Sequence, residues 1–118
     1  MTVDDEPDVT YCLKACLEET GLVQVDGYID PILALAKFKP STFDLVILDI
    51  RMPVMNGFEL FKKMKNIDSM AEACFITAFE DYREEFKESF PKLDEAKYFI
   101  RKPKAIEDLV NHVATILG

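Results

Sequence analysis

The sequence is short of the residues on which several classes of protein depend. It has one histidine and three cysteines, and Cys12, Cys16 and Cys74 show no CxxC spacing. An odd number of cysteines without paired spacing argues against a disulfide framework and for a reducing compartment. One histidine leaves a zinc site without an obvious ligand set. Cys12 and Cys16 lie four residues apart on one helix face and are expected to be small core residues.

Long apolar runs and basic residues are also scarce. No run of about eighteen apolar residues is present, so the sequence predicts no membrane-spanning helix. Residues 1–6 lack the basic and apolar regions of a signal peptide. The chain has 14 Lys and Arg against 22 Asp and Glu, a net charge of −8, which argues against direct binding to nucleic acid. We therefore expect a cytoplasmic protein that contacts neither a membrane nor nucleic acid directly.

The length and the charge pattern place limits on the organisation. A chain of 118 residues with 49% hydrophobic residues, and without repeats or a Gly/Ser-rich linker, is expected to form a single domain over residues 1–118. Residues 1–60 contain 11 acidic and 4 basic residues, whereas residues 61–118 contain 11 acidic and 10 basic residues. The net negative charge is therefore concentrated in the first half, at −7 against −1 in the second.

Short apolar runs alternate with amphipathic stretches along the chain. The runs predict strands at residues 1–3, 22–25, 43–49, 73–77 and 97–101. The amphipathic stretches predict helices from Pro7 to Gly21, from Pro31 to Phe38, after Asn56-Gly57, at residues 81–90 and at residues 105–117. This alternation indicates an α/β fold of the (βα)₅ type, with a parallel sheet and helices on both faces.

Polar side chains follow four of the predicted strands. Asp4 and Asp5 follow the first strand, Asp49 ends the third, Thr77 ends the fourth and Lys102 follows the fifth. Because ligands bind at the carboxyl ends of parallel strands, these residues are expected to meet at one edge. Three carboxylates brought together repel one another, which favours a bound cation, and ligands that are all oxygen favour Mg²⁺. Each residue alone fits an ordinary turn, cap or strand, but together they indicate a site.

These motifs resemble the receiver domain of two-component response regulators. The residues that carry the resemblance are Asp4-Asp5-Glu6-Pro7, Leu45-Val46-Ile47-Leu48-Asp49-Ile50-Arg51-Met52-Pro53 with Asn56-Gly57, Ile76-Thr77-Ala78 and Lys102-Pro103. The resemblance covers essentially the whole chain and implies a flavodoxin-like sandwich with strand order 2-1-3-4-5. The first strand is short for the central position that this topology gives it.

The resemblance also implies a role for each residue of the metal and phosphoryl sites. Asp49 would be the phosphoacceptor, and Mg²⁺, or alternatively Mn²⁺, would be bound by Asp4, Asp5, Asp49 and the backbone carbonyl of Arg51. Thr77 and Lys102 would bind the phosphoryl oxygens.

Further residues are implied to switch the domain or to tune it. Phe99, an aromatic residue on the fifth strand, would move with Thr77 on phosphorylation, while Tyr98 would point to the opposite face. The bond before Pro103 would be cis. Arg51 and Phe79 would lie over the site and tune the lifetime of the phosphoryl group.

The implied partners follow from a phosphorelay. A sensor histidine kinase or a phosphotransfer protein would supply the phosphoryl group, and a downstream protein would bind the surface of the fourth helix, the fifth strand and the fifth helix. A homodimer is a further possible assembly. The only chemistry expected is self-catalysed phosphoryl transfer and autodephosphorylation. With no output domain after Gly118, the chain is expected to be a stand-alone receiver or an excised piece.

Two other functions remain as alternatives. A haloacid-dehalogenase-like phosphatase also uses an aspartate nucleophile and Mg²⁺, but it expects a second aspartate where this chain has Arg51. A receiver-like adaptor that is never phosphorylated would not need the complete set of Asp5, Asp49, Thr77 and Lys102.

Overall fold

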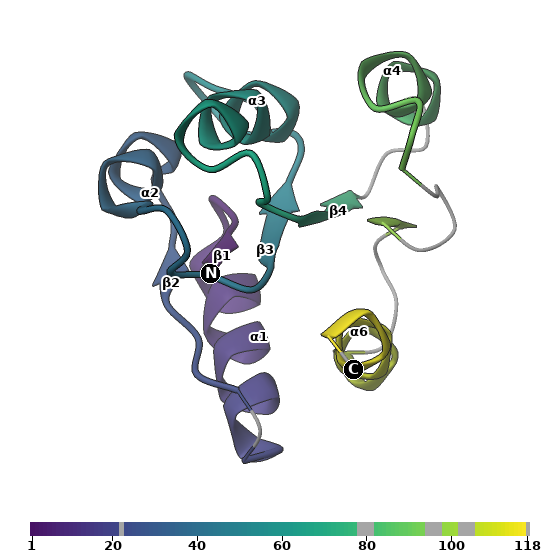
Figure 1. Cartoon of the computed structure of the whole chain (residues 1–118). Helices are drawn as coiled ribbons and strands as arrows, with labels where there is room; N and C mark the ends of the chain where they lie inside the picture. Colours follow the sequence, from purple (N-terminus) through teal and green to yellow (C-terminus); the bar gives the residue numbers. More distant parts are fainter. Residues whose placement is uncertain (22, 78–81, 94–97, 102–105, 118) are drawn as a thin grey trace.

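Strands and helices alternate along the whole chain (Figure 1). The computed structural model describes residues 1–21, 23–77, 82–93, 98–101 and 106–117. Its elements are β1 (Thr2–Val3), α1 (Pro7–Glu19), β2 (Gly27–Tyr28), α2 (Pro31–Lys37), β3 (Val46–Asp49), α3 (Gly57–Ile67), β4 (Ala73–Thr77), α4 (Arg83–Ser89), β5 (Phe99–Arg101) and α6 (Ile106–Leu117). The predicted α/β alternation is confirmed.

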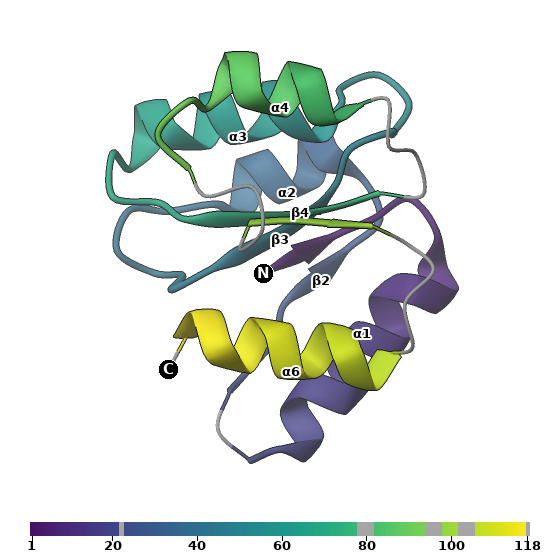
Figure 2. The same cartoon turned by 90° about the vertical axis from the view of Figure 1, so that its right-hand side faces the viewer.

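The five strands form one parallel sheet in the order β2-β1-β3-β4-β5. Helices α1 and α6 cover one face of the sheet, and α2, α3 and α4 cover the other (Figures 1 and 2). The predicted order and the placement of helices on both faces are therefore confirmed. In this topology the carboxyl ends of β1, β3, β4 and β5 lie along one edge.

The two faces of the sheet bury different side chains. The face under α2, α3 and α4, called the aromatic face below, buries Phe38, Phe58, Phe61, Phe75, Phe86 and Phe99. The face under α1 and α6, called the aliphatic face, buries Leu13, Leu17, Val25, Leu45, Ile47, Cys74, Ile76, Ile100, Leu109 and Val113. Because side chains alternate along a strand, β4 directs Phe75 to one face and Cys74 and Ile76 to the other. Burial raises the pKa of the Cys74 thiol to about 12.

Two helices begin at the residues that the sequence predicts. The Asn56 side chain accepts a hydrogen bond from the Glu59 amide (2.9 Å), and the Glu59 side chain accepts one from the Asn56 amide (3.3 Å). This capping box satisfies amides at the start of α3 that lack a partner within the helix. The Asp30 side chain accepts a hydrogen bond from the Ile32 amide (2.9 Å), so α2 begins at Pro31.

The inner strand β1 is short, as the sequence predicts, and its two residues are one fewer than the predicted strand at residues 1–3. Met1 extends its ladder, because the Met1 carbonyl accepts a hydrogen bond from the Ile47 amide (2.8 Å). The α-amino group of Met1 donates to the Leu45 carbonyl (3.1 Å). Burial lowers the pKa of this amine to about 6, against the opposing effect of Asp26 and Asp44.

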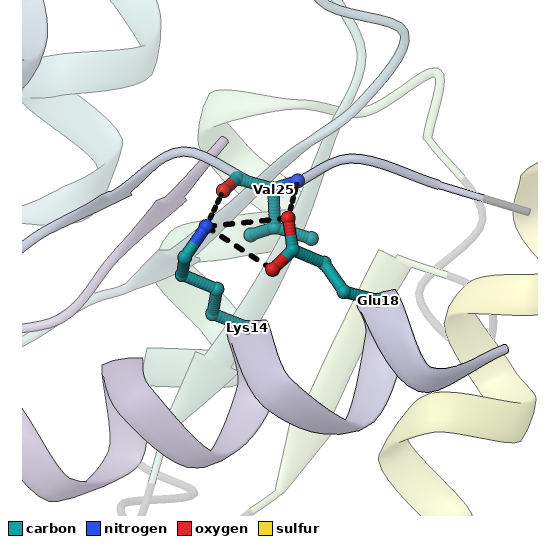
Figure 3. Close-up of polar contacts among 3 residues, drawn as sticks. All are labelled: Lys14, Glu18 and Val25. Atoms are coloured by element: carbon teal, nitrogen blue, oxygen red, sulfur yellow. Dashed lines mark hydrogen bonds and ion pairs between the residues drawn. The ribbon is translucent and has the colours of Figure 1, made fainter. Parts of the chain in front are cut away.

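The prediction of a strand at residues 22–25 is wrong for the described part, residues 23–25; the edge strand β2 is Gly27–Tyr28. Side chains of α1 bind the backbone around Val25 instead (Figure 3). Lys14 donates to the Val25 carbonyl (2.6 Å), and the Val25 amide donates to Glu18 (3.1 Å). Val25 is buried against the aliphatic face, so the apolar pattern predicted its burial but not its hydrogen bonds.

The expectation that both cysteines of α1 lie in the core is also wrong. Cys12 is exposed and Cys16 is half-buried, whereas Leu13 and Leu17 are buried. The turn of the helix centres its buried face on the two leucines, and this places Cys12 on the solvent side.

Candidate functional site

The strand register brings the predicted site residues to one edge of the sheet. Val3 pairs with Leu48, so the next residues, Asp4 and Asp49, lie side by side at the ends of β1 and β3. Asp49 pairs with Ile76, and Thr77 therefore lies one residue beyond it on β4.

Three carboxylates meet at this edge. One oxygen from each of Asp4, Asp5 and Asp49 lies within 4.8 Å of the other two. Asp4 is 1% exposed and Asp49 is 6% exposed, while Asp5 is more accessible to solvent. Burying carboxylates so close together is unfavourable unless positive charge or hydrogen-bond donors compensate it. We call these three residues the carboxylate cluster.

Local hydrogen bonds hold Asp4 in position. Its side chain accepts a hydrogen bond from the Glu6 amide (3.0 Å), and its backbone amide donates to the Tyr28 carbonyl (3.1 Å). The Thr10 hydroxyl of α1 donates to the Asp4 carbonyl (3.0 Å). The contact of Thr10 was missed by the sequence reasoning, and no local motif signals it because it depends on how α1 packs against β1.

The chemistry of the carboxylate cluster fits a hard divalent cation. Its donors are all oxygen atoms, and Mg²⁺ binds through a few carboxylates while keeping several waters. The partial exposure of Asp5 leaves one side of the cluster open to solvent. The residues present are therefore suited to hold Mg²⁺ or Mn²⁺.

Gly57 fixes the position of Asp49 from the other side. A Cβ atom at Gly57 would collide with the backbone carbonyl of Asp49, and the Gly57 amide donates to the Ile50 carbonyl (2.8 Å). Only glycine permits so close an approach of α3 to the end of β3. The sequence reasoning identified Asn56-Gly57 as a helix start and part of a motif but missed this contact, for which the glycine itself was the signal.

The loop between β3 and α3 contains a strained residue. Val54 has a positive φ of 73°, and its side chain is 88% exposed. A β-branched residue at positive φ is strained, because its Cβ substituents crowd the backbone. Val54 lies five residues after Asp49 and was not singled out by the sequence reasoning.

Some of the other predicted site residues lie within the described part of the chain and some lie outside it. Thr77 is fully buried at the end of β4 and pairs with Arg101 of β5. Arg51 is exposed, and its carbonyl as a metal ligand stays a prediction. Three further predictions, Lys102 and Phe79 beside the phosphoryl group and the cis bond before Pro103, lie outside the described residues.

Phe99, the predicted switch residue, is packed inside the aromatic face. It is 6% exposed, its ring centroid lies 5.2 Å from that of Phe86, and the Arg83 guanidinium lies 5.6 Å from its centroid. The expectation that Tyr98 points to the opposite face is wrong, since Tyr98 packs against the same cluster. Tyr98 precedes β5, so strand alternation does not govern its direction.

Comparisons with known proteins point to one family. The profile of the response regulator receiver domain matches residues 1–114. The response regulator receiver protein CpdR of Brucella abortus is 29% identical over 117 residues, which cover 99% of this chain and 94% of that protein. An uncharacterized response regulatory protein of Vibrio cholerae is 32% identical over 118 residues, which cover 99% of this chain and 47% of that protein.

The chain spans about half or less of the length of several other curated relatives that it matches. Among solved structures, the response regulator TrrA of Thermotoga maritima, in complex with Mg²⁺-BeF, is 31% identical with a TM-score of 0.79. The match covers 98% of this chain and 95% of that chain. Among the helices of the described residues, none has the length and apolar composition needed to cross a bilayer.

Proposed function

Because the chain belongs to the family of response regulator receiver domains, we propose that Asp49 accepts a phosphoryl group and that this modification switches the surface of α4, β5 and α6. The observation that carries the proposal is the carboxylate cluster, in which one oxygen of each residue lies within 4.8 Å of the other two, at the edge where Thr77 ends β4. The proposal treats residues 1–118 as one receiver domain.

The proposed reaction is transfer of a phosphoryl group to a carboxylate. An oxygen of Asp49 attacks the phosphorus atom of the donor, a new oxygen–phosphorus bond forms, and the bond from phosphorus to the leaving group breaks. With a phosphohistidine donor, the leaving imidazole takes up a proton. A carboxylate nucleophile needs no general base, so positioning and charge neutralisation dominate catalysis. Water later attacks the phosphorus atom of the acyl phosphate, the bond from the Asp49 oxygen to phosphorus breaks, and inorganic phosphate leaves as the Asp49 carboxylate is regenerated.

The other site residues position the reacting groups. Asp4, Asp5, Asp49 and the carbonyl of Arg51 would hold Mg²⁺, or Mn²⁺ as the alternative. The bound ion supplies positive charge that offsets the negative charge on the phosphoryl oxygens. The relative TrrA, crystallised with Mg²⁺-BeF, supports this assignment.

The switch is proposed to join the phosphoryl group to the aromatic face. Thr77 and Lys102 would bind the phosphoryl oxygens, and movement of the Thr77 hydroxyl would shift the packing of Phe99. The close contact of Phe99 with Phe86 supports this role, because it links β5 directly to α4. Arg51 and Phe79 are proposed to affect the rate at which water reaches the acyl phosphate.

The proposed setting is a cytoplasmic phosphorelay. A sensor histidine kinase or a phosphotransfer protein would donate the phosphoryl group, and a downstream protein would bind the surface of α4, β5 and α6. A homodimer is the alternative assembly. The chain would catalyse only its own phosphorylation and dephosphorylation.

The direct test adds Mg²⁺ and beryllofluoride to the chain and follows the adduct by fluorine NMR. We expect an adduct that disappears in Asp49→Asn and that persists in Asp44→Asn, a matched change near the opposite end of β3. Acetyl phosphate should label the same residue covalently, as detected by mass spectrometry. Circular dichroism checks that both variants fold.

Each alternative function predicts a different outcome of this test. If no adduct depends on Asp49, the phosphoacceptor assignment is wrong and the adaptor function remains. Sustained turnover of phosphate esters, with release of inorganic phosphate over many cycles, would instead indicate the phosphatase.

A further inference from the structure

A groove of about 500 Å³ lies at the edge of the sheet opposite the carboxylate cluster. It is bounded by the end of α3, the start of β4, the end of α4 and residues 91–93; α3 and α4 lie side by side above this part of the sheet (Figure 2). Its apolar walls include Phe61, Ala71, Phe90, Leu93 and Tyr98. This volume falls within the range of roughly 300–1,000 Å³ typical of binding clefts.

Among the described residues, the rim of the groove carries more basic than acidic side chains. Lys65 and Lys92 line it, and so does Glu72. The Lys65 ammonium donates to the Ser69 carbonyl (2.8 Å) and lies 5.8 Å from the centroid of the Phe61 ring. These contacts hold the Lys65 side chain beside the groove. Because the side chain is already ordered, it loses less conformational entropy when a partner binds.

This rim contrasts with the charge of the rest of the protein. The net charge of the chain is −8, yet the described residues that line the groove include two lysines, Lys65 and Lys92, and one acidic residue, Glu72. Met70, also on the rim, is 82% exposed. A partner that complements this surface has apolar side chains for the groove and carboxylates for the lysines.

Ring contacts connect the groove to the proposed switch. The centroid of Phe90, a wall of the groove, lies 5.4 Å from that of Phe61 and 6.0 Å from that of Phe86. The Phe86 ring in turn contacts Phe99 at 5.2 Å. Phe90 is thus two ring contacts from the switch residue, and close-packed rings cannot shift independently of their neighbours.

We propose that this groove binds an acidic amphipathic segment of a partner protein and that the state of Asp49 changes its affinity. Apolar side chains of the segment pack on Phe61 and Phe90, and its carboxylates pair with Lys65 and Lys92. The second part of the proposal, the response to Asp49, rests on the proposed function; the first part does not.

The test uses two pools of fluorescently labelled synthetic helical peptides. Both pools carry Leu or Phe at one-turn spacing, and the remaining positions are Glu and Asp in one pool and Lys in the other. Fluorescence anisotropy with the intact chain is expected to show binding of acidic peptides and not of basic ones. The double variant Lys65→Glu, Lys92→Glu is expected to weaken binding about tenfold or more.

A matched charge reversal on the same helix provides the control. Lys62 and Lys63 are exposed and do not line the groove. The double variant Lys62→Glu, Lys63→Glu makes the same change in net charge and is expected to weaken binding less than about threefold, because screening limits its effect at physiological salt. Equal effects of the two double variants would overturn the proposal, as would equal binding of both pools.

The response to Asp49 is measured by repeating the titration with Mg²⁺ and beryllofluoride. We expect a change in peptide affinity of at least about threefold, absent in Asp49→Asn. If the adduct forms and peptide affinity does not change, the proposed response of the groove to Asp49 is wrong. The assignment of Asp49 as phosphoacceptor then still stands. If no adduct forms and the acidic peptides still bind, the proposed function is wrong. The assignment of the groove as a peptide-binding site then still stands. Displacement of bound peptide by anionic phospholipid vesicles, or by self-association of the chain, would show another occupant and overturn the proposal.

Discussion

The two faces of the sheet differ in the kind of side chain that fills them. The face under α2, α3 and α4 is packed with aromatic rings, and the buried cluster under α1 and α6 contains no aromatic residue among those described. Aromatic rings are large and rigid, and they pack in preferred edge-on or offset orientations, whereas aliphatic side chains adjust through rotamer changes.

This difference matters because of where Phe99 lies. Both faces end at the edge that carries Asp49, but the proposed switch residue points into the aromatic face and contacts Phe86 of α4. A shift of one ring there requires its neighbours to move. We therefore expect a change at Asp49 to be transmitted through the aromatic face and to leave the aliphatic face largely unaltered.

The largest expected effect comes from breaking the aromatic face at its centre. Phe75 is fully buried and its ring contacts those of Phe58, Phe61, Phe86 and Phe90. Phe75→Ala is expected to lower the free energy of unfolding by about 3–5 kcal/mol, as measured by urea denaturation.

Two smaller substitutions on β4 serve as references for the loss of stability in Phe75→Ala. Ile76→Val, on the aliphatic face, is expected to cost about 1 kcal/mol. If Phe75→Ala does not fold, Phe75→Leu retains most of the apolar volume and is expected to cost less than about 1.5 kcal/mol. A loss in Phe75→Ala no greater than that in Ile76→Val would contradict the account of the aromatic face.

A pH titration tests the burial of the Met1 amine, which lies next to β1. For a polypeptide whose first residue is Met1, burial lowers the pKa of the amine from 8.0 to about 6. Between these values the unfolded chain binds a proton that the folded chain does not, so stability falls as the pH decreases from 8 to 6. The expected loss is about 2 kcal/mol, with little further change below pH 6 from this group. N-terminal acetylation should remove this part of the pH dependence; an unchanged profile would contradict the assignment.

A smaller effect is expected at the outer edge of the aliphatic face. Lys14→Met removes the hydrogen bond to the Val25 carbonyl and is expected to lower the free energy of unfolding by about 1 kcal/mol. Hydrogen exchange at the Val25 amide should speed up at the same time, since Lys14 also positions its acceptor Glu18. Lys63→Met, at an exposed position of α3, serves as the control; an equal effect there would show that lost charge alone is responsible.

An effect of similar size but opposite sign, a gain in stability, is expected outside both faces. Val54→Asn relieves strain at a positive φ of 73°, and the exposed valine side chain gives up little packing. We expect stabilisation by about 1 kcal/mol with adduct formation at Asp49 retained. A decrease in the urea midpoint would show that Val54 makes a contact that compensates its strain.

The sequence predicted the central sheet well because parallel strands buried on both faces are almost continuously apolar. Residues 46–49 and 73–77 followed that pattern. The predicted strand at residues 22–25 is not formed at residues 23–25, where Lys14 and Glu18 of α1 bind the backbone of Val25. An apolar pattern reports burial and cannot report which group accepts a backbone hydrogen bond.

The same limit applies to the site. Asp4, Asp49 and Thr77 could be brought together from the sequence because the ends of parallel strands share one edge. The contact of Thr10 with the Asp4 carbonyl and the approach of Gly57 to Asp49 depend on how α1 and α3 pack against the sheet. No local pattern specifies that packing.

The most direct test of the central claim is an NMR comparison of the two faces before and after adduct formation at Asp49. With Mg²⁺ and beryllofluoride, we expect large shifts of the Phe86, Phe90 and Phe99 ring signals and small shifts of the Leu13 and Val113 methyl signals, all absent in Asp49→Asn. Equal shifts on both faces, or ring shifts that persist in Asp49→Asn, would contradict the account.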